Sequence, residues 1–451
     1  MATAVGDRRT HIVAVPFPGR GHINPMMNLC RVLATRDLAI TVVVTEEWLD
    51  LLSGPNLPSS SPALPSNIRL LSVPNILPSE RIRGGNYREF FEAVIFKMGE
   101  PVERLVGELE QPADVVVADS LLPWAAEICR RRNIPAVSLW TESASVFLAL
   151  YTFDRLDSAA QLPDDLSEVE SLAHLPNFSS PHIAGILPNA TPVDLLRLFA
   201  RKFYWFHTAH SLLMTTFSEL EPAAVDRITA TFAVPIFPVG PSIPHTLPSS
   251  SSGSHLLWLD SQPERSVIYV SLGSFLSISV SQMEEIAGGL AGSGAAFLWI
   301  VRDELHRELI RNRVEQGSAG GRGFVSPWCE QLRVLCHPAV GGFLTHCGWN
   351  SVMEGAYAGV PMLTFPLFWD QEPNSKLVVE EWGIGLRLKE AKRESVEGMV
   401  RELMDLDGKE SRERRSRAAE IRELSRKAVE EGGASSMRLD EFLGKIRKKQ
   451  E

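Results

Sequence analysis

The sequence comprises 451 residues with a formal net charge of −10, so it is too long for one ordinary hydrophobic core and too acidic for a nucleic-acid partner. Its five cysteines are an odd number, which indicates a reducing compartment rather than a disulfide framework. No segment offers about 20 uninterrupted apolar residues, and we expect no membrane-spanning helix. These properties predict a cytoplasmic protein of two domains.

The first half of the sequence alternates short β-branched runs with longer helical patterns. The patterns predict strands at residues 12–15, 39–44, 68–72, 115–118 and 136–139, and helices at residues 24–34 and 123–131. Residues 57–66 are rich in Pro and Ser, which indicates a loop. Strand–helix alternation is typical of a parallel sheet covered on both faces, so we predict an α/β domain.

A second alternating series follows the linker-like residues 241–254, PSIPHTLPSSSSGS. It predicts strands at residues 267–272, 296–301, 341–345 and 361–365, and then a solvated helical face from residue 390 onward. We place an N-terminal domain at residues 1–244, a linker at 245–256, a C-terminal domain at 257–435 and a final helix at 436–451. We expect that helix to pack back on the N-terminal domain, and a ligand site where the domains face each other.

The segment THCGWNSVMEG, residues 345–355, has the composition of an anion site. A strand ends there, a glycine turn follows, and a helix-compatible run starts near Val352. The free N–H groups and the dipole of a helix N-terminus both favour negative charge. Asn350 and Ser351 could instead be plain helix caps, but a cap needs neither His346 nor Glu354.

Four side chains in and around this segment suit the other parts of a nucleotide sugar. Glu354 could accept hydrogen bonds from a ribose diol, and Trp328 offers a flat face on which a base can stack. Asp370 and Gln371 follow a predicted strand and are natural partners for sugar hydroxyls. Each also has a structural interpretation: Trp328 could lie in the core, and Asp370 with Gln371 could form a turn.

In the N-terminal half, His22 and Asp119 each follow a predicted strand. A histidine with a carboxylate beside it is the arrangement of a general base that is oriented and stabilised by its partner. His22 could instead be structural, and Asp119 could cap a helix. The spacing of Gly19 and Gly21 hints at a dinucleotide site, but Asn24 stands where the third glycine would be.

Residues 328–371, from the opening Trp through the HCGWNS core to the closing Gln, resemble the signature box of plant family-1 UDP-sugar glycosyltransferases. The resemblance implies an α/β GT-B fold, with two Rossmann-like parallel-sheet domains facing across a cleft and the nucleotide sugar on the C-terminal domain. It implies this assignment: uracil at Trp328, Cys329 and Gln331, diphosphate at His346, Trp349, Asn350 and Ser351, ribose at Glu354, and sugar at Asp370 and Gln371. Glu330 departs from the family pattern, in which most members carry Pro.

The resemblance extends to the N-terminal half and to the reaction. GHINP resembles the loop of the catalytic histidine, His22, and VVADS the strand of its partner, Asp119. Thr141 resembles a residue that contacts the donor sugar, and Ser274 belongs to what looks like a second phosphate-side loop. The closing Gln is associated in this family with glucose over galactose, so we expect UDP-glucose as co-substrate. We further expect transfer of the sugar with inversion, by a monomer without a metal or other cofactor.

The acceptor implied by the resemblance is a small lipophilic molecule with hydroxyl or carboxyl groups. Aromatic residues of the N-terminal half could line its pocket, although most of them are of a type usually found in a core. They are Phe90, Phe91, Trp124, Trp140, Phe147, Tyr204, Trp205 and Phe206.

Other functions remain open at this point. A nicotinamide-dependent oxidoreductase would share the α/β halves, and a non-catalytic nucleotide-sugar binding protein would share residues 328–371. A zinc site at Cys336-His337 and His346-Cys347 is disfavoured, because adjacent Cys-His pairs do not fit one tetrahedron easily. The Asp405-x-Asp407 motif lies in a charged helical region and is more typical of a helix terminus than of a metal site.

Overall fold

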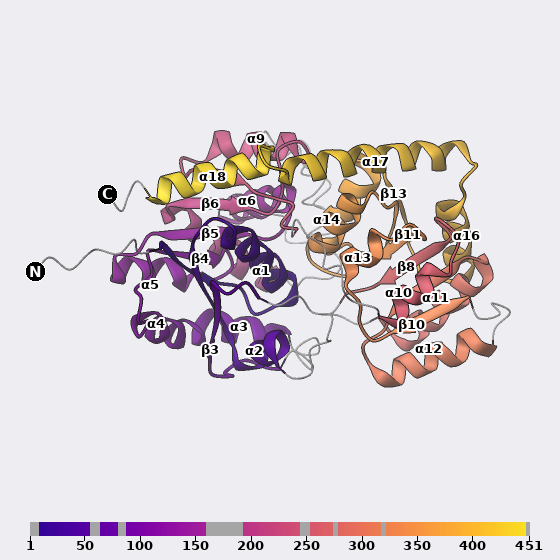
Figure 1. Cartoon of the computed structure of the whole chain (residues 1–451), viewed down its shortest axis with the longest axis horizontal. Coiled ribbons are helices and arrows are strands. Elements are labelled where there is room, and N and C mark those ends of the chain that lie inside the picture. The colour runs from indigo at the N-terminus through magenta and orange to yellow at the C-terminus, as the bar shows by residue number, and fades with distance from the viewer. Residues whose placement is uncertain are drawn as a thin grey trace, which may run out of the picture. The chain divides into compact units, whose positions relative to one another are not determined.

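The computed structural model describes residues 9–54, 64–79, 87–158, 193–243, 253–273, 278–316 and 322–447. The chain forms two compact units (Figure 1). Unit 1 comprises Met1–Leu162, Pro192–Pro248 and Ala428–Glu451, and unit 2 comprises Pro163–Thr191 and Ser249–Lys427. Within the described ranges, no helix is both long and apolar enough to cross a membrane.

Unit 1 contains a parallel sheet of seven strands in the order β3-β2-β1-β4-β5-β6-β7. Its strands are β1 His11–Val15, β2 Ala39–Thr45, β3 Ile68–Val73, β4 Val115–Asp119, β5 Ala136–Trp140, β6 Ser211–Met214 and β7 Ile236–Pro238. Its helices are α1 Arg20–Ala34, α2 Glu46–Ser53, α3 Tyr87–Lys97, α4 Gly99–Gly107, α5 Trp124–Arg132, α6 Ala144–Ser158, α8 Val193–Lys202, η3 Phe203–Thr208, α9 Pro222–Thr231 and α18 Ala434–Arg447.

The last helix, α18, supplies part of the core of unit 1. Leu439, Phe442, Leu443 and Ile446 are buried in the same apolar cluster as strand residues such as Val42. Burial of four large apolar side chains stabilises this packing by roughly 1.5–3 kcal/mol for each residue. The end of the chain is therefore an integral part of unit 1.

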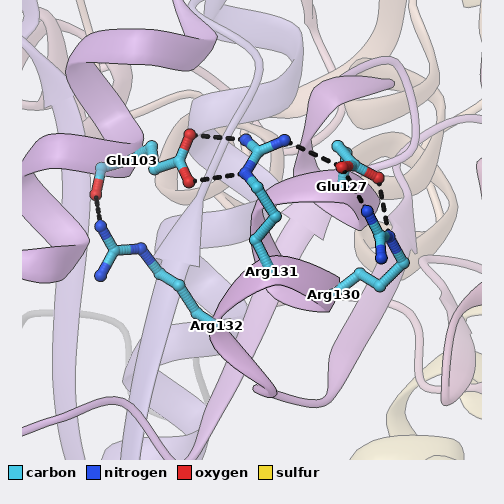
Figure 2. A network of polar contacts seen from close by, with 5 residues as sticks. All are labelled: Glu103, Glu127, Arg130, Arg131 and Arg132. Carbon is cyan, nitrogen blue, oxygen red and sulfur yellow. Dashed lines mark hydrogen bonds and ion pairs between the residues drawn. The ribbon is translucent and has the colours of Figure 1, made fainter.

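Helices α4 and α5 of unit 1 are joined by a network of exposed ion pairs (Figure 2). Arg131 holds Glu103 through two hydrogen bonds of 2.9 and 2.5 Å and reaches Glu127 at 3.0 Å. Arg130 also binds Glu127, and Arg132 donates to the Glu103 backbone carbonyl at 2.9 Å. Arg131 and Arg132 thus connect α5 to Glu103 of α4. Exposed pairs of this kind contribute about 0–1 kcal/mol each.

Unit 2 contains a parallel sheet of six strands in the order β10-β9-β8-β11-β12-β13. Its strands are β8 Val267–Ser271, β9 Ala296–Ile300, β10 Gly323–Ser326, β11 Val340–Thr345, β12 Met362–Thr364 and β13 Gly385–Arg387. Its helices are α10 Ser254–Asp260, α11 Val280–Ser293, α12 Glu304–Gln316, α13 Gln331–Leu335, α14 Trp349–Ala358, α15 Gln371–Lys376, η4 Leu377–Glu381, α16 Arg393–Met404 and α17 Lys409–Val429.

The predicted strands are all confirmed, and their ends differ from the expected ones by at most one residue. Strands β6, β7, β10 and β13 were not predicted, because segments of three or four residues are too short to show alternation. The predicted start of α1 at Asn24 is wrong, since the helix begins at Arg20. Pro25 lies inside this helix, although proline disfavours an interior position.

Candidate active site

The strand order of each sheet reverses beside its first strand, and the candidate site residues gather at these two points. In unit 1 the reversal lies between β1 and β4, and in unit 2 between β8 and β11. Open α/β sheets bind ligands at the carboxyl ends of such strands. His22 follows β1 and Asp119 ends β4, while His346 follows β11. Both units therefore place a histidine at the ligand-binding edge of the sheet.

The half-buried His22 and the buried Asp119 form a pair in unit 1. The Nδ1 atom of His22 lies 2.9 Å from Oδ2 of Asp119, whose side chain is 1% exposed. The other carboxylate oxygen accepts a hydrogen bond of 2.9 Å from the Leu121 backbone N–H. His22 lies in the first turn of α1, so its expected position in a loop is wrong. The helix holds the ring more firmly than a loop would.

Thr141 lies beside the same ring nitrogen. Its Oγ1 atom is 2.8 Å from Nδ1 of His22, and its side chain is buried. An ionised carboxylate only accepts hydrogen bonds, so we assign the imidazole proton to Nδ1, directed at Asp119 and Thr141. The Nε2 atom is then unprotonated and able to accept a proton. Thr141 thus belongs to the surroundings of His22, and its predicted contact with the donor sugar stays a prediction.

A cluster of three phenylalanines contacts the His22 ring through Phe17. Phe17 directly follows β1, and its ring centroid lies 5.0 Å from that of His22. Phe90 and Phe91 pack on Phe17 at 5.7 and 5.6 Å. Phe17 and Phe90 are buried, and Phe91 is half-buried. Sequence reasoning did not single out Phe17, although its place after a strand is the signal that identified His22.

Most of the other aromatic residues considered for the acceptor pocket lie in the core of unit 1. Trp140 and Phe147 are buried and pack edge to face at 5.2 Å, and Phe206 packs on Phe147 at 5.0 Å. Trp205 is buried and donates to the Ser120 carbonyl at 2.8 Å. Trp124 and Tyr204 are half-buried. The aromatic group nearest His22 is therefore Phe17 with Phe90 and Phe91.

In unit 2, the turn between β11 and α14 exposes a helix N-terminus. Cys347 adopts a left-handed conformation with φ of 67°, and its N–H donates to Thr345 Oγ1 at 3.1 Å. Helix α14 begins at Trp349, so the expected start near Val352 is wrong. The cap residue is Gly348, which has no side chain to cap the helix, and the Trp349 N–H donates to the Asp370 carboxylate at 3.3 Å. Asn350 and Ser351 therefore lie in the first turn, where backbone N–H groups favour an anion.

His346 is enclosed by two glycines on this turn. A Cβ atom added to Gly273 would lie 2.8 Å from the ring, and one added to Gly348 would lie 2.7 Å from Nε2. Burial lowers the pKa of His346 to about 4, so the ring is neutral near pH 7. Its Nδ1 atom is buried and has no hydrogen-bond partner among the described residues. Ser274, the predicted neighbour of this loop, lies outside the described residues.

Gln331 and Glu354 face each other below the helix N-terminus. The Nε2 atom of Gln331 donates to Glu354 Oε2 at 2.5 Å and to Ser351 Oγ at 3.0 Å. Burial raises the pKa of Glu354 to about 7, although the hydrogen bond from Gln331 lowers it. This carboxyl group therefore changes its charge in the neutral pH range.

The loop before α13 carries the predicted uracil contacts. Trp328 is half-buried, and its carbonyl accepts a hydrogen bond of 2.8 Å from Ser326 Oγ. Cys329 is buried. Glu330, the departure from the family pattern, occupies the N-cap position of α13 without capping it through its side chain. Its carboxylate lies 3.6 Å from Arg333, so the Glu330 side chain forms an ion pair within α13 and its cap.

Asp370 ties the start of α15 to the turn before α14. Its Oδ2 atom accepts hydrogen bonds from the Trp349 backbone N–H at 3.3 Å and from Asn374 Nδ2 at 2.6 Å. The same Asn374 amide donates to the Cys347 carbonyl at 3.0 Å. Asn374 is fully buried and was not predicted, because nothing in the local sequence links it to Cys347.

Gln371 is oriented by the backbone of the preceding loop. Its Oε1 atom accepts hydrogen bonds from the N–H groups of Leu367 at 2.8 Å and Phe368 at 3.0 Å. The amide oxygen is therefore occupied, and the amide N–H₂ group is the part that suits a hydroxyl oxygen. The predicted contact of Gln371 with a sugar stays a prediction.

The Asp405-x-Asp407 motif is a helix terminus. The Asp405 carboxylate accepts hydrogen bonds from the N–H groups of Asp407 at 2.9 Å and Gly408 at 3.0 Å, directly before α17. In the part of the chain that the structure describes, no group of three or more His, Cys, Asp or Glu side chains could hold a metal ion.

The chain is similar to known glycosyltransferases along almost its whole length. Residues 245–417 match the family described as UDP-glucoronosyl and UDP-glucosyl transferase, and residues 9–49 match the glycosyltransferase N-terminal domain. UDP-glycosyltransferase 87A2 of Arabidopsis thaliana is 42% identical over 97% of this chain and 96% of its own length.

The fold is similar to solved glycosyltransferase structures. Medicago truncatula UGT71G1, complexed with UDP-glucose, gives a TM-score of 0.78 at 26% identity over 97% of this chain and 98% of that one. Phytolacca americana UGT2, complexed with UDP-2fluoro-glucose and pterostilbene, gives 0.77 at 25% identity over 97% of this chain and 100% of that one. These likenesses and the two Rossmann-like sheets confirm the predicted GT-B fold.

Proposed function

The chain belongs to the plant family-1 UDP-glycosyltransferases, enzymes that transfer a sugar from a UDP-sugar, and we propose that it transfers glucose with inversion to a small lipophilic acceptor. The acceptor group is a hydroxyl or a carboxyl. The observation that carries the proposal is the His22–Asp119 pair, with Nδ1 of His22 2.9 Å from the carboxylate and Nε2 left to accept a proton. Membership of this enzyme family argues against the alternatives of a nicotinamide-dependent oxidoreductase and of a non-catalytic binding protein.

The proposed reaction is a single displacement. Nε2 of His22 takes the proton of the acceptor hydroxyl while the acceptor oxygen forms a bond to the anomeric carbon. The bond from that carbon to the UDP oxygen breaks, and UDP leaves with the electron pair. Asp119 stabilises the imidazolium ion that forms, as its burial beside Nδ1 allows. Attack opposite the leaving group converts an α-linked donor into a β-linked product.

The proposed donor site lies on unit 2. Backbone N–H groups in the first turn of α14 and the neutral His346 ring donate hydrogen bonds to the diphosphate, and the helix dipole offsets its charge. Glu354 accepts hydrogen bonds from the ribose hydroxyls. The N–H₂ group of Gln371 binds a hydroxyl of the sugar, which supports glucose as the transferred group. Uracil stacks on Trp328.

The proposed acceptor is apolar around its reacting group. Phe17 packs on the His22 ring and Phe91 packs on Phe17, so this side of the His22 ring is aromatic rather than charged. The Phytolacca americana relative in this fold was solved with pterostilbene, which supports an acceptor of similar character. A phenolic hydroxyl is acidic enough to lose its proton readily to a histidine base.

A donor and acceptor screen tests this function. Purified protein is incubated with UDP-glucose, UDP-galactose or UDP-glucuronate and with a panel of phenols, terpenoid alcohols and aromatic carboxylic acids, and UDP release is measured. We expect turnover with UDP-glucose in preference to the other donors, and a β-linked product by NMR. An α-linked product would exclude inversion, and turnover only with UDP-galactose or UDP-glucuronate would exclude glucose as the donor sugar.

A further inference from the structure

A buried tyrosine contacts the Gln331–Glu354 pair through the amide of Gln331. Tyr269 belongs to β8, is 1% exposed, and stacks on Phe343 with ring centroids 5.1 Å apart. Its hydroxyl donates to Gln331 Oε1 at 3.1 Å and lies 3.3 Å from the Cys329 sulfur. A buried hydroxyl is costly only when it lacks partners, and here Gln331, Cys329 and Ser271 supply hydrogen bonds that hold it in place.

We propose that Tyr269 is a positioning residue for the donor: its hydroxyl fixes the orientation of the Gln331 amide and, through that amide, the Glu354 carboxyl. This inference rests on the proposed function, because it gives Tyr269 a role through the residues assigned to the nucleoside. Tyr269 itself is not assigned a contact with the donor.

The direction of the hydrogen-bond chain follows from the available protons. Because the Tyr269 hydroxyl donates its only proton to Gln331 Oε1, the Cys329 thiol is the donor in the contact between Cys329 and Tyr269. With Oε1 occupied, Nε2 of Gln331 must face Ser351 and Glu354. A reversed amide would direct Oε1 at the Glu354 carboxylate, which cannot donate when ionised.

These hydrogen bonds join four separate segments of unit 2. Tyr269 comes from β8, Cys329 from the loop before α13, Gln331 from α13, and Glu354 from α14. Tyr269 and Gln331 are 62 residues apart in sequence. The hydroxyl therefore anchors the mobile end of a glutamine side chain to a rigid central strand of the sheet, which lowers the conformational entropy lost when the nucleoside binds.

The charge of Glu354 depends on this orientation. The titratable groups that interact with the Glu354 carboxyl are Tyr269, Cys329 and Cys336. Burial raises the pKa of each of these three groups, so all three are neutral near pH 7. The hydrogen bond from Gln331 is then the interaction that favours the ionised carboxylate, against the burial that raises its pKa to about 7. Loss of the correct amide orientation should raise that pKa further.

The variant Tyr269→Phe tests the inference, because it removes the hydroxyl and keeps the ring that stacks on Phe343. The Kd of UDP is measured by calorimetry between about pH 6 and pH 8.5, and the kinetic constants at saturating acceptor. We expect UDP to bind roughly 2- to 10-fold more weakly near pH 7, the size of one net hydrogen bond. We also expect the midpoint of the pH dependence of Kd to move upward, a higher KM for the donor, and an unchanged kcat.

A double variant separates positioning from a loss of packing. If Tyr269 acts through Gln331, then Gln331→Ala and Tyr269→Phe combined should bind UDP no more weakly than Gln331→Ala alone. Additive effects would overturn the inference, as would a Tyr269→Phe variant with the Kd and pH midpoint of the wild type. Tyr151→Phe, which removes a hydroxyl of unit 1 bonded to Arg155, is the matched control and should bind UDP normally.

The two levels of inference fail in different ways. If the wild type does not bind UDP at all, the proposed function fails and the role of Tyr269 fails with it. If the wild type binds UDP and transfers sugar while Tyr269→Phe is indistinguishable from it, only the role of Tyr269 is overturned.

Discussion

The two units place a histidine at the same point of similar sheets, yet they give the two rings opposite surroundings. His22 follows β1 and has a buried carboxylate 2.9 Å from Nδ1. His346 follows β11, is enclosed by Gly273 and Gly348, and has no hydrogen-bond partner for Nδ1 among the described residues. Burial without a counter-charge lowers the pKa of His346 to about 4.

This difference teaches that the backbone position makes a ligand-binding edge, while the neighbouring charges decide what the histidine does there. A carboxylate beside His22 stabilises the charged ring, which a general base needs after it accepts a proton. Burial, together with the charge of Arg302, keeps His346 neutral, which suits a hydrogen-bond donor to phosphate. Variants at each position can break or sharpen this comparison.

The largest effect is expected at His22. Replacing it in His22→Ala removes the only group assigned as base, so kcat/KM with a phenolic acceptor should fall by roughly 10²–10⁴-fold. UDP binding should stay unchanged, since the donor site lies on unit 2. Steady-state kinetics and calorimetry measure the two quantities.

The control is His306→Ala, which removes a histidine of α12 paired with Asp303 at 3.4 Å. It should retain the wild-type kcat/KM. Near-wild-type turnover by His22→Ala would show that His22 is not the base. The proposed difference between His22 and His346 would then be wrong.

A smaller effect is expected when the partner of His22 loses its charge. Asp119→Asn keeps the size of the side chain but no longer stabilises the imidazolium ion. Hydrogen bonds to charged groups contribute about 1.5–3 kcal/mol, so kcat should fall by roughly 10- to 150-fold. A Thr141→Val variant, which removes only the neutral neighbour of Nδ1, should lose less activity than Asp119→Asn; the reverse order would assign the orienting role to Thr141.

Much of the sheet architecture and the His22–Asp119 pair could be predicted from the sequence for one physical reason. Carboxyl ends of adjacent parallel strands meet at one edge, so residues that follow such strands come together. The start of α1 was not predicted, because Gly21 and the interior Pro25 are residues that disfavour a helix.

The supporting contacts of the site could not be predicted in this way. Tyr269 reads as one more apolar strand residue, and its contact with Gln331 spans 62 residues. Asn374 reaches the Cys347 carbonyl across 27 residues from a different helix. Such contacts depend on how helices pack on the sheet, and a single sequence carries no periodic signal for them.

An intermediate effect on donor binding is expected at Glu354. Its pKa of about 7 means that the carboxylate form, which accepts hydrogen bonds from a ribose diol, is lost as the pH falls through 7. The Kd of UDP should therefore rise with acidity below about pH 7 in the wild type. Glu354→Gln should bind UDP about 5- to 10-fold more weakly near pH 8, with no such pH dependence.

Thermal unfolding provides an independent check on Glu354. Its pKa is raised in the folded chain, so the folded state binds the proton more tightly, and this contribution to stability is lost as the pH rises from about 4.5 to 7. Relative to the wild type, Glu354→Gln should gain Tm at pH 8 compared with pH 5. An equal Tm difference at both values would mean that Glu354 has an ordinary pKa.

The smallest effect is expected at His346, and it tests the comparison most directly. A neutral ring donates one hydrogen bond to phosphate, worth about 0.5–1.5 kcal/mol, so His346→Asn should weaken UDP binding by only about 2- to 10-fold. Because the pKa of about 4 keeps the ring neutral, the ratio of the two Kd values should be constant between about pH 5.5 and pH 8. If the ratio grows toward acid pH, the bound diphosphate raises the pKa of His346 and the ring becomes protonated. His346 would then act as a cation, like the charged form of His22, and not as a neutral donor.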